Sequence, residues 1–289
     1  MIRRLCFNTA SLPGFDLDEA LSAGCDLGFR CVELLAFDGY RHTAGDLAGR
    51  FFDCLSPAEM ERLAASIDPF EHVAVHAPFW DVMPFSPNPT VREPAREQLR
   101  RTLTVSGEIG VETVTTHVIP RMGHTLEEFR PEVLSLYREL GDVAADAGVT
   151  ITIETGYPME IDVFAGLLDE IDHPAVGANV DVGHLRGLLS EAERAPEAIG
   201  AAYNALLAQH VRSLGDRIYH VHLHDVQAEG VRDHREAGTG IIDYEAFFRM
   251  LMERDYGGLV SFELEEAQAQ AALGRSREVA MNAMRAAAE

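Results

Sequence analysis

The sequence Val180-Asp181-Val182-Gly183-His184 ends an apolar run with a carboxylate and, three residues later, an imidazole. Both side chains are common ligands of divalent metals. Several other apolar runs also end in a polar residue that can bind a metal or a substrate, and these residues are His76, His117, Glu154, His222 and Glu263. Because a β/α barrel carries its active site at the C-terminal ends of its strands, this pattern predicts such a barrel.

Eight short segments rich in apolar and β-branched residues are spaced along the chain. The expected strands are residues 5–9, 31–37, 72–77, 113–119, 149–154, 176–182, 218–223 and 259–264. Helix start signals lie between them, including the capping boxes Ser56-Pro57-Ala58-Glu59 and Thr125-Leu126-Glu127-Glu128. The first strand is not followed by the Gly-x-Gly-x-x-Gly of a dinucleotide-binding sheet. The sequence therefore predicts one α/β domain over residues 1–289, a single (β/α)8 TIM barrel.

The composition excludes several classes of function. Lysine is absent, and all 24 basic residues are arginine, which rules out Schiff-base aldolases, pyridoxal phosphate enzymes and Walker A sites. The formal net charge of −23 disfavours binding to nucleic acid or to an anionic membrane. No apolar run reaches the roughly 18 residues of a membrane span. We therefore expect neither nucleic acid nor membrane as a partner.

The cysteines and the N-terminal segment bear on the cellular compartment. The four cysteines form no Cys-x-x-Cys pair, so reduced thiols are expected rather than a disulfide framework. The N-terminal segment turns polar at Asn8 and does not have the form of a signal peptide. We expect a cytoplasmic protein.

Three histidines alternate in the segment Tyr219-His220-Val221-His222-Leu223-His224. Alternate residues of a strand share one face, so we expect one histidine to bind a metal and its neighbours to form hydrogen bonds at the barrel mouth. The longest loop expected on the same side, residues 78–89, contains Phe79 and the only tryptophan, Trp80. These rings could pack over a sugar or close a lid, and a loop folded on its own hydrophobic cluster is the alternative.

Together these segments resemble the sugar isomerase/epimerase superfamily of xylose isomerase-like barrels. This superfamily includes ketose 3-epimerases, hydroxypyruvate isomerase, inosose dehydratase and, more distantly, endonuclease IV-type apurinic/apyrimidinic (AP) endonucleases. The resemblance covers nearly the whole chain. It rests on the motifs Val75-His76-Ala77-Pro78-Phe79, Ile153-Glu154, Asp181-Val182-Gly183-His184, His222-Leu223-His224-Asp225, Gly238-Thr239-Gly240-Ile241-Ile242-Asp243 and Ser261-Phe262-Glu263.

The resemblance implies a metal-dependent sugar isomerase or epimerase. Its metal ligands would be Glu154, Asp181, His222 and Glu263, which match the ligand positions of the epimerases on strands five to eight. Three carboxylates and one imidazole suit Mn²⁺, Mg²⁺ or Co²⁺, and Zn²⁺ is also compatible. The metal would stabilise an enediolate, while Glu154 and Glu263 exchange protons on the two faces of the substrate.

Further residues are expected to contact the substrate. The resemblance assigns this role to His184 and Glu160, although an acid such as Glu160 is also favoured at the start of a helix. The other candidates are His76, His117, Arg232 and His234. The expected partner is a small-molecule carbohydrate, and the resemblance also allows a homo-oligomer because the family commonly forms dimers or tetramers.

Three alternatives remain open. A dehydratase of the inosose or 3-dehydroshikimate type would use the same metal and the same first proton abstraction, and would then expel hydroxide. An endonuclease IV-like AP endonuclease would use a similar ligand set, but Arg232 replaces the aspartate expected two residues before His234, and the acidic charge opposes DNA binding. A binding or scaffold module would leave the clustered carboxylates without a purpose.

Overall fold

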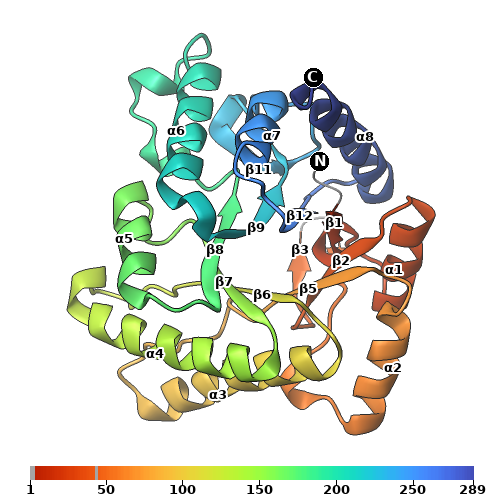
Figure 1. Cartoon of the computed structure of the whole chain (residues 1–289), viewed down its shortest axis with the longest axis vertical. Coiled ribbons are helices and arrows are strands. Elements are labelled where there is room, and N and C mark those ends of the chain that lie inside the picture. Colours follow the sequence, from red (N-terminus) through yellow and green to blue (C-terminus); the bar gives the residue numbers. More distant parts are fainter. Residues whose placement is uncertain (1–3, 43–44) are drawn as a thin grey trace.

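The predicted barrel is present in the structure, a computed structural model that describes residues 4–42 and 45–289. Within these residues, eight parallel strands close in the order β1-β12-β9-β8-β7-β6-β5-β2 (Figure 1). They are β1 (Leu5–Asn8), β2 (Cys31–Leu35), β5 (His72–His76), β6 (Thr113–Thr116), β7 (Thr150–Glu154), β8 (Val176–Asp181), β9 (Ile218–Leu223) and β12 (Leu259–Phe262). All expected strands are confirmed, and the largest difference is in β6, which was expected to extend to residue 119.

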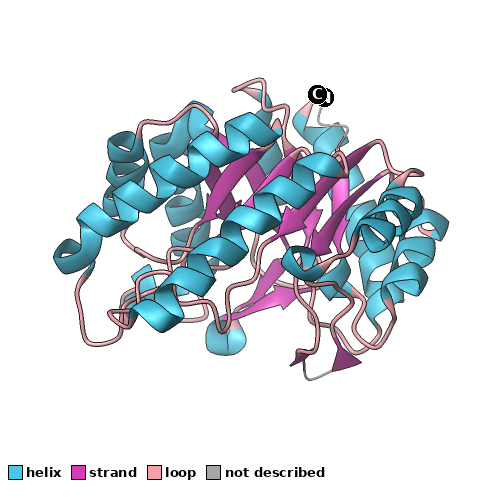
Figure 2. Ribbon diagram, turned by 90° about the horizontal axis from the view of Figure 1, so that it is seen from below, coloured by secondary structure: helices cyan, strands magenta, loops and turns pink. Residues whose placement is uncertain are grey.

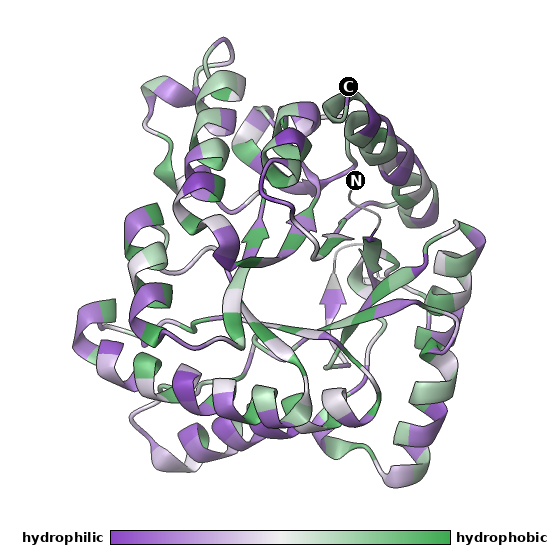
Figure 3. Cartoon of the chain, in the orientation of Figure 1, coloured by the Kyte–Doolittle hydropathy of each residue, from purple (hydrophilic) through white to green (hydrophobic). Residues whose placement is uncertain are grey.

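Helices pack around the outside of the barrel (Figure 2). The α-helices of the described residues are α1 (Leu17–Asp26), α2 (Pro57–Ile67), α3 (Pro89–Glu108), α4 (Leu126–Ala147), α5 (Ile161–Ile171), α6 (Ile199–Leu214), α7 (Tyr244–Met252) and α8 (Ala269–Ala287). Figure 3 shows hydrophobic and hydrophilic residues mixed along these helices, as expected for helices that bury one face. None of the helices in the described part of the chain is long and apolar enough to span a membrane.

Local sequence sets the ends of two helices that cover the barrel. Ser56 and Glu59 form a capping box at the start of α2, where the Ser56 N–H donates to Glu59 Oε2 at 2.8 Å. Thr125 and Glu128 do the same for α4 at 2.7 Å. Gly148 ends α4 with a φ of 72°, a left-handed conformation that glycine adopts without strain. Both capping boxes were predicted and are confirmed.

Among the described residues, two short antiparallel strand pairs lie outside the barrel sheet. One pairs β3 (Arg41–His42) with β4 (Gly45–Asp46), and the other pairs β10 (Asp225–Gln227) with β11 (Arg232–Arg235). The β10–β11 hairpin was not expected from the sequence. It follows β9 directly and brings His234 against His224, with ring centroids 4.3 Å apart.

Successive side chains of each barrel strand point alternately to the surrounding helices and to the barrel interior. Residues that face the helices are apolar and form the main core, such as Phe7, Val32, Leu34, Val75, Val114, Ile151, Ile153, Val180, Val221, Val260 and Phe262. Residues that face the barrel interior are largely polar and fully buried, such as Asn8, Glu33, Thr115, Thr152, Asn179, His220, His222 and Ser261. Barrel interiors are usually filled by branched apolar residues. This interior is instead polar, and several of its buried polar atoms, among them His222 Nδ1, have no hydrogen-bond partner among the described residues.

Candidate metal centre and active site

The four predicted metal ligands come together at the C-terminal ends of neighbouring strands. Glu154 and Asp181 are the last residues of β7 and β8, His222 lies in β9, and Glu263 directly follows β12. Each offers one ligand atom, and these atoms all lie within 4.8 Å of one another. His222 Nδ1 is 2.9 Å from Glu263 Oε2, 3.3 Å from Glu154 Oε2 and 3.9 Å from Asp181 Oδ2. Strand order in the barrel, β12-β9-β8-β7, explains this convergence.

These donor atoms fit a divalent cation. Ligands at about 2.1 Å from a metal stand roughly 3 Å apart in octahedral geometry, close to the separations found here. Glu154 Oε2 and His222 Nδ1 are buried without a hydrogen-bond partner among the described residues. Three carboxylates so close together repel one another unless positive charge is present. The donor set, rich in oxygen, suits Mn²⁺, Mg²⁺ or Co²⁺ and also accepts Zn²⁺.

The pKa of His222 also shows that this group of carboxylates favours a positive charge. Burial lowers the pKa of His222, but the carboxylates of Glu33, Glu154 and Glu263 raise it by more, so the pKa stands well above its ordinary value. In protein without a cation, a proton on His222 therefore supplies the missing positive charge.

Asp181 is held by a second histidine. His224 Nε2 lies 3.1 Å from both carboxylate oxygens of Asp181. The backbone N–H of His234 donates to His224 Nδ1 at 3.0 Å, which leaves the His224 proton on Nε2, where it points to Asp181. The Gly183 N–H also donates to Asp181 Oδ1 at 2.7 Å. Hydrogen bonds at the barrel mouth were predicted for His220 and His224, but His220 instead lies in the barrel interior, where its Nε2 contacts Glu33. Only His222 belongs to the four-residue ligand set.

Four further histidines surround the carboxylates, and all were predicted to contact substrate: His76, His117, His184 and His234. His184 Nδ1 donates to the Thr155 carbonyl at 2.8 Å and lies 3.2 Å from Glu154 Oε1. Burial lowers the pKa of His117 to about 4, so this ring is neutral at pH 7. Burial also opposes protonation of His234, but interactions with Asp233 and Glu263 raise its pKa to about 9.

A cavity of about 210 Å³ opens above this centre. Glu154 and Glu263 line the cavity, whereas Asp181 and His222 are 0% exposed and are not among the residues that line it. Phe37, Phe79 and Trp80 line the cavity, and Tyr40 packs against Phe37 and Trp80. We define these four residues as the aromatic wall. The two aromatic residues of the long loop therefore lie at the cavity, next to rings from the loop after β2.

Two predicted substrate residues, Glu160 and Arg232, do not line the cavity. Glu160 is exposed and occupies the N-cap position of α5, which was the alternative for this residue. Arg232 is exposed at the start of β11. Regular alternation would place Arg232 on the same face as His234, but His234 has a φ of 56° and the β10–β11 pairing is irregular. Arg232 therefore does not line the cavity together with His234.

Residues that the sequence did not single out also contribute to the site. Glu33 of β2 is fully buried and contacts His220 and His222. The sequence did contain evidence for a special role of Glu33, because it is the one charged residue in the apolar run Cys31-Val32-Glu33-Leu34-Leu35. Phe37 and Tyr40 lie in an irregular loop, where no periodic pattern marks them.

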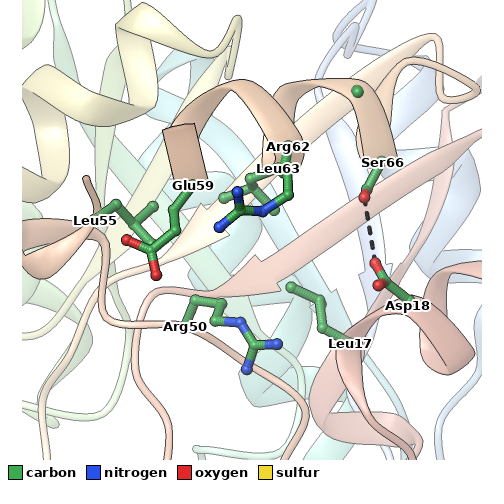
Figure 4. A pocket seen from close by; sticks show the side chains of 9 residues that line it. Leu17, Asp18, Arg50, Leu55, Glu59, Arg62, Leu63 and Ser66 are labelled. Carbon is green, nitrogen blue, oxygen red and sulfur yellow. Dashed lines mark hydrogen bonds between the residues drawn. The ribbon is translucent and has the colours of Figure 1, made fainter. Parts of the chain in front are cut away.

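A larger hollow of about 670 Å³ lies on the outside of the barrel, between α1 and α2 (Figure 4). Arg50, Glu59 and Arg62 are among its charged residues, and Ser66 Oγ donates to Asp18 Oδ1 at 3.2 Å across it. None of the candidate metal ligands lines this hollow. The smaller cavity at the strand ends is therefore the candidate active site.

Comparison with known proteins agrees with the fold. Among curated proteins, the chain is 28% identical over 225 residues to an uncharacterized protein of Methanocaldococcus jannaschii. The alignment covers 72% of this chain and 70% of that protein. It is also 29% identical over 147 residues to the L-ribulose 3-epimerase of Methylomonas sp. (strain DH-1). This alignment covers 49% of this chain and 44% of that enzyme.

Solved structures resemble the chain over nearly its whole length. A D-tagatose 3-epimerase-like protein superposes with a TM-score of 0.74 at 22% identity, covering 99% of this chain and 98% of that one. A xylose isomerase-like TIM barrel protein from Mycobacterium smegmatis, solved in complex with magnesium, superposes with a TM-score of 0.72 at 16% identity. This superposition covers 99% of this chain and 98% of that one. The family model for the xylose isomerase-like TIM barrel matches residues 21–285. The chain therefore belongs to the xylose isomerase-like TIM barrel family.

Proposed function

We propose that this protein is a divalent metal-dependent isomerase or epimerase of a small polyhydroxylated carbonyl compound. The observation that carries the proposal is the division of the four candidate ligands. Asp181 and His222 are fully buried and do not line the cavity, whereas Glu154 and Glu263 both line it. Proton transfer next to a carbonyl needs carboxylates that can approach a substrate carbon.

A cation held by Glu154, Asp181, His222 and Glu263 would act as a Lewis acid and stabilise the enediolate charge that develops on the substrate. One of the two cavity carboxylates takes the proton from the carbon next to the carbonyl, and the other returns a proton to the opposite face. His184 and His234 lie 3.2 Å and 3.8 Å from Glu154 and Glu263, respectively. Each ring can hold a substrate hydroxyl beside the carboxylate that it accompanies.

The size of the cavity and the relatives support a sugar substrate. About 210 Å³ is less than the roughly 300–1,000 Å³ of sites for drug-sized ligands, so the substrate is a small molecule. Similar proteins are named for L-ribulose and D-tagatose 3-epimerisation. Epimerisation of a ketose at the carbon next to its carbonyl is therefore the first reaction to test.

The test is turnover of a ketose panel with Mn²⁺ in D₂O. We expect deuterium at the carbon next to the carbonyl, detected by NMR. Glu263→Gln should lower the rate by about 10²–10⁴-fold because it removes a proton-transfer group. Glu266→Gln, a matched change three residues along the same loop and outside the cavity, should leave the rate nearly unchanged. Retention of the original hydrogen would indicate a hydride shift, and loss of water would indicate a dehydratase.

Phosphodiester cleavage of the endonuclease IV type is a second candidate, favoured by one observation. His76, His117 and Glu154 form another group whose ligand atoms lie within 4.8 Å of one another, so the cavity can hold a second cation. Against this candidate stand the net charge of −23 and an exposed arginine at position 232. Efficient incision of an abasic DNA duplex at physiological salt, with three zinc ions per chain, would favour it over isomerisation.

A further inference from the structure

The carboxylate of Glu33 lies beside the candidate metal centre without belonging to the four-residue ligand set. It is fully buried, with Oε1 3.1 Å from His222 Nε2 and Oε2 3.2 Å from His220 Nε2. In the barrel, β1 and β12 separate β2 from β9, so these contacts cross the barrel interior. Each oxygen of Glu33 therefore accepts one imidazole N–H.

We propose that Glu33 is a positioning residue that keeps the proton of His222 on Nε2 and so directs the Nδ1 lone pair to the cation site. An imidazole binds metal through its unprotonated nitrogen, and the hydrogen bond made by the other nitrogen decides which one that is. Here Nδ1 faces Glu263 Oε2 at 2.9 Å and Glu154 Oε2 at 3.3 Å. The inference rests on the proposed metal centre.

A purely stabilising role does not account for this cluster. A buried ion pair repays its desolvation poorly, and apolar residues of similar volume often stabilise a protein equally well or better. The usual filling of a barrel interior is Val, Ile or Leu. Glu33, His220 and His222 are each 0% exposed, so the Glu33 carboxylate and its hydrogen bonds are fully removed from water. Orientation of a ligand is a purpose that apolar residues cannot serve.

His220 completes the arrangement by holding the second oxygen of Glu33. With both oxygens bound, the carboxylate cannot turn away from His222. The three alternating histidines of residues 219–224 thus have different roles. His222 offers Nδ1 to the cation, His220 anchors Glu33, and His224 holds Asp181.

The first test is Mn²⁺ affinity measured by calorimetry on wild-type protein and two variants. The amide of Glu33→Gln can donate to His222 Nε2 and favour a proton on Nδ1, so the affinity should fall about 10–100-fold. Thr115→Val removes a buried interior hydroxyl that bonds to Thr152 rather than to a candidate ligand, and its affinity should stay within about threefold of wild type.

The outcomes separate the inference from the proposed function. Wild-type protein that binds no Mn²⁺ would overturn the metal centre and, with it, the role of Glu33. Tight binding by both wild type and Glu33→Gln would overturn only the role of Glu33, as would an equal loss in Thr115→Val. A loss confined to Glu33→Gln supports the role of Glu33 even if no ketose is turned over.

A second measurement needs no variant. Wild-type protein with ¹⁵N-labelled histidine and bound Zn²⁺ can be examined by long-range ¹H–¹⁵N NMR. We expect His222 to carry its proton on Nε2 and to bind the metal through Nδ1. Coordination through Nε2 would overturn the proposal even if Glu33→Gln does not fold.

Discussion

Gly183 separates two side chains that pack closely behind the candidate metal centre. A Cβ at this position would lie 2.2 Å from His224 Cε1 and 2.7 Å from Asp233 Cβ, closer than the 3.0 Å below which something must shift. His224 is the residue that holds Asp181. A displaced His224 would therefore release a candidate ligand, and glycine is required here for space rather than for backbone freedom.

We expect Gly183→Ala to destabilise the fold by about 1–3 kcal/mol through overpacking, and to weaken Mn²⁺ binding as well. The matched control is Gly166→Ala in α5, where an added Cβ meets no atom within 4 Å and should stabilise the helix by roughly 0.5–1 kcal/mol. Thermal unfolding and Mn²⁺ titration measure both effects. Unchanged Mn²⁺ affinity in Gly183→Ala would contradict the role assigned to His224.

At the scale of elements, the packing of α6 on α5 includes a buried titratable group away from the centre. His210 of α6 is 1% exposed and meets Phe164 of α5 edge-on, with centroids 6.0 Å apart. Neither ring nitrogen of His210 has a hydrogen-bond partner in the described ranges. Burial lowers the pKa of His210 to about 4, so the folded state holds this ring neutral.

Acid should therefore weaken the contact between α5 and α6. The folded pKa lies below the unfolded value of about 6.5, so this stability is present above pH 6.5 and is lost as the pH falls toward 4. At pH 5 the loss amounts to about 2 kcal/mol. His210→Leu should remove it, and urea unfolding at pH 7 and pH 5 measures the difference. An equal pH dependence in wild type and variant would show that His210 is not held neutral.

At the scale of the whole molecule, a cation that joins four strands should stabilise the folded barrel as a unit. A ligand present at about 100 times its Kd adds about 2.7 kcal/mol of stability. For a chain of 289 residues, that corresponds to a rise in Tm of roughly 4–5 °C. We expect EDTA to lower the Tm of purified protein and Mn²⁺ to restore it. His222→Gln should not respond, and an equal response in this variant would place the cation elsewhere.

The sequence predicts the barrel well because each strand carries its own evidence. Alternation and a polar residue at the strand end are local patterns, and closure of the barrel then brings Glu154, Asp181, His222 and Glu263 together. Contacts across the barrel interior, such as Glu33 with His222, depend on the register between strands, which no local pattern gives. The β10–β11 hairpin was missed for a related reason, since irregular pairing hides its alternation.

The aromatic wall also gives the protein an optical property. Trp80 is the only tryptophan of the chain, lines the candidate cavity and is 43% exposed. The fluorescence emitted on tryptophan excitation therefore comes from a single known place. A sugar that enters the cavity would exclude water from this indole and change its emission, while a ligand bound in the hollow between α1 and α2 would not touch it. Each molecule of this protein thus carries a built-in fluorescent reporter at the mouth of its candidate active site.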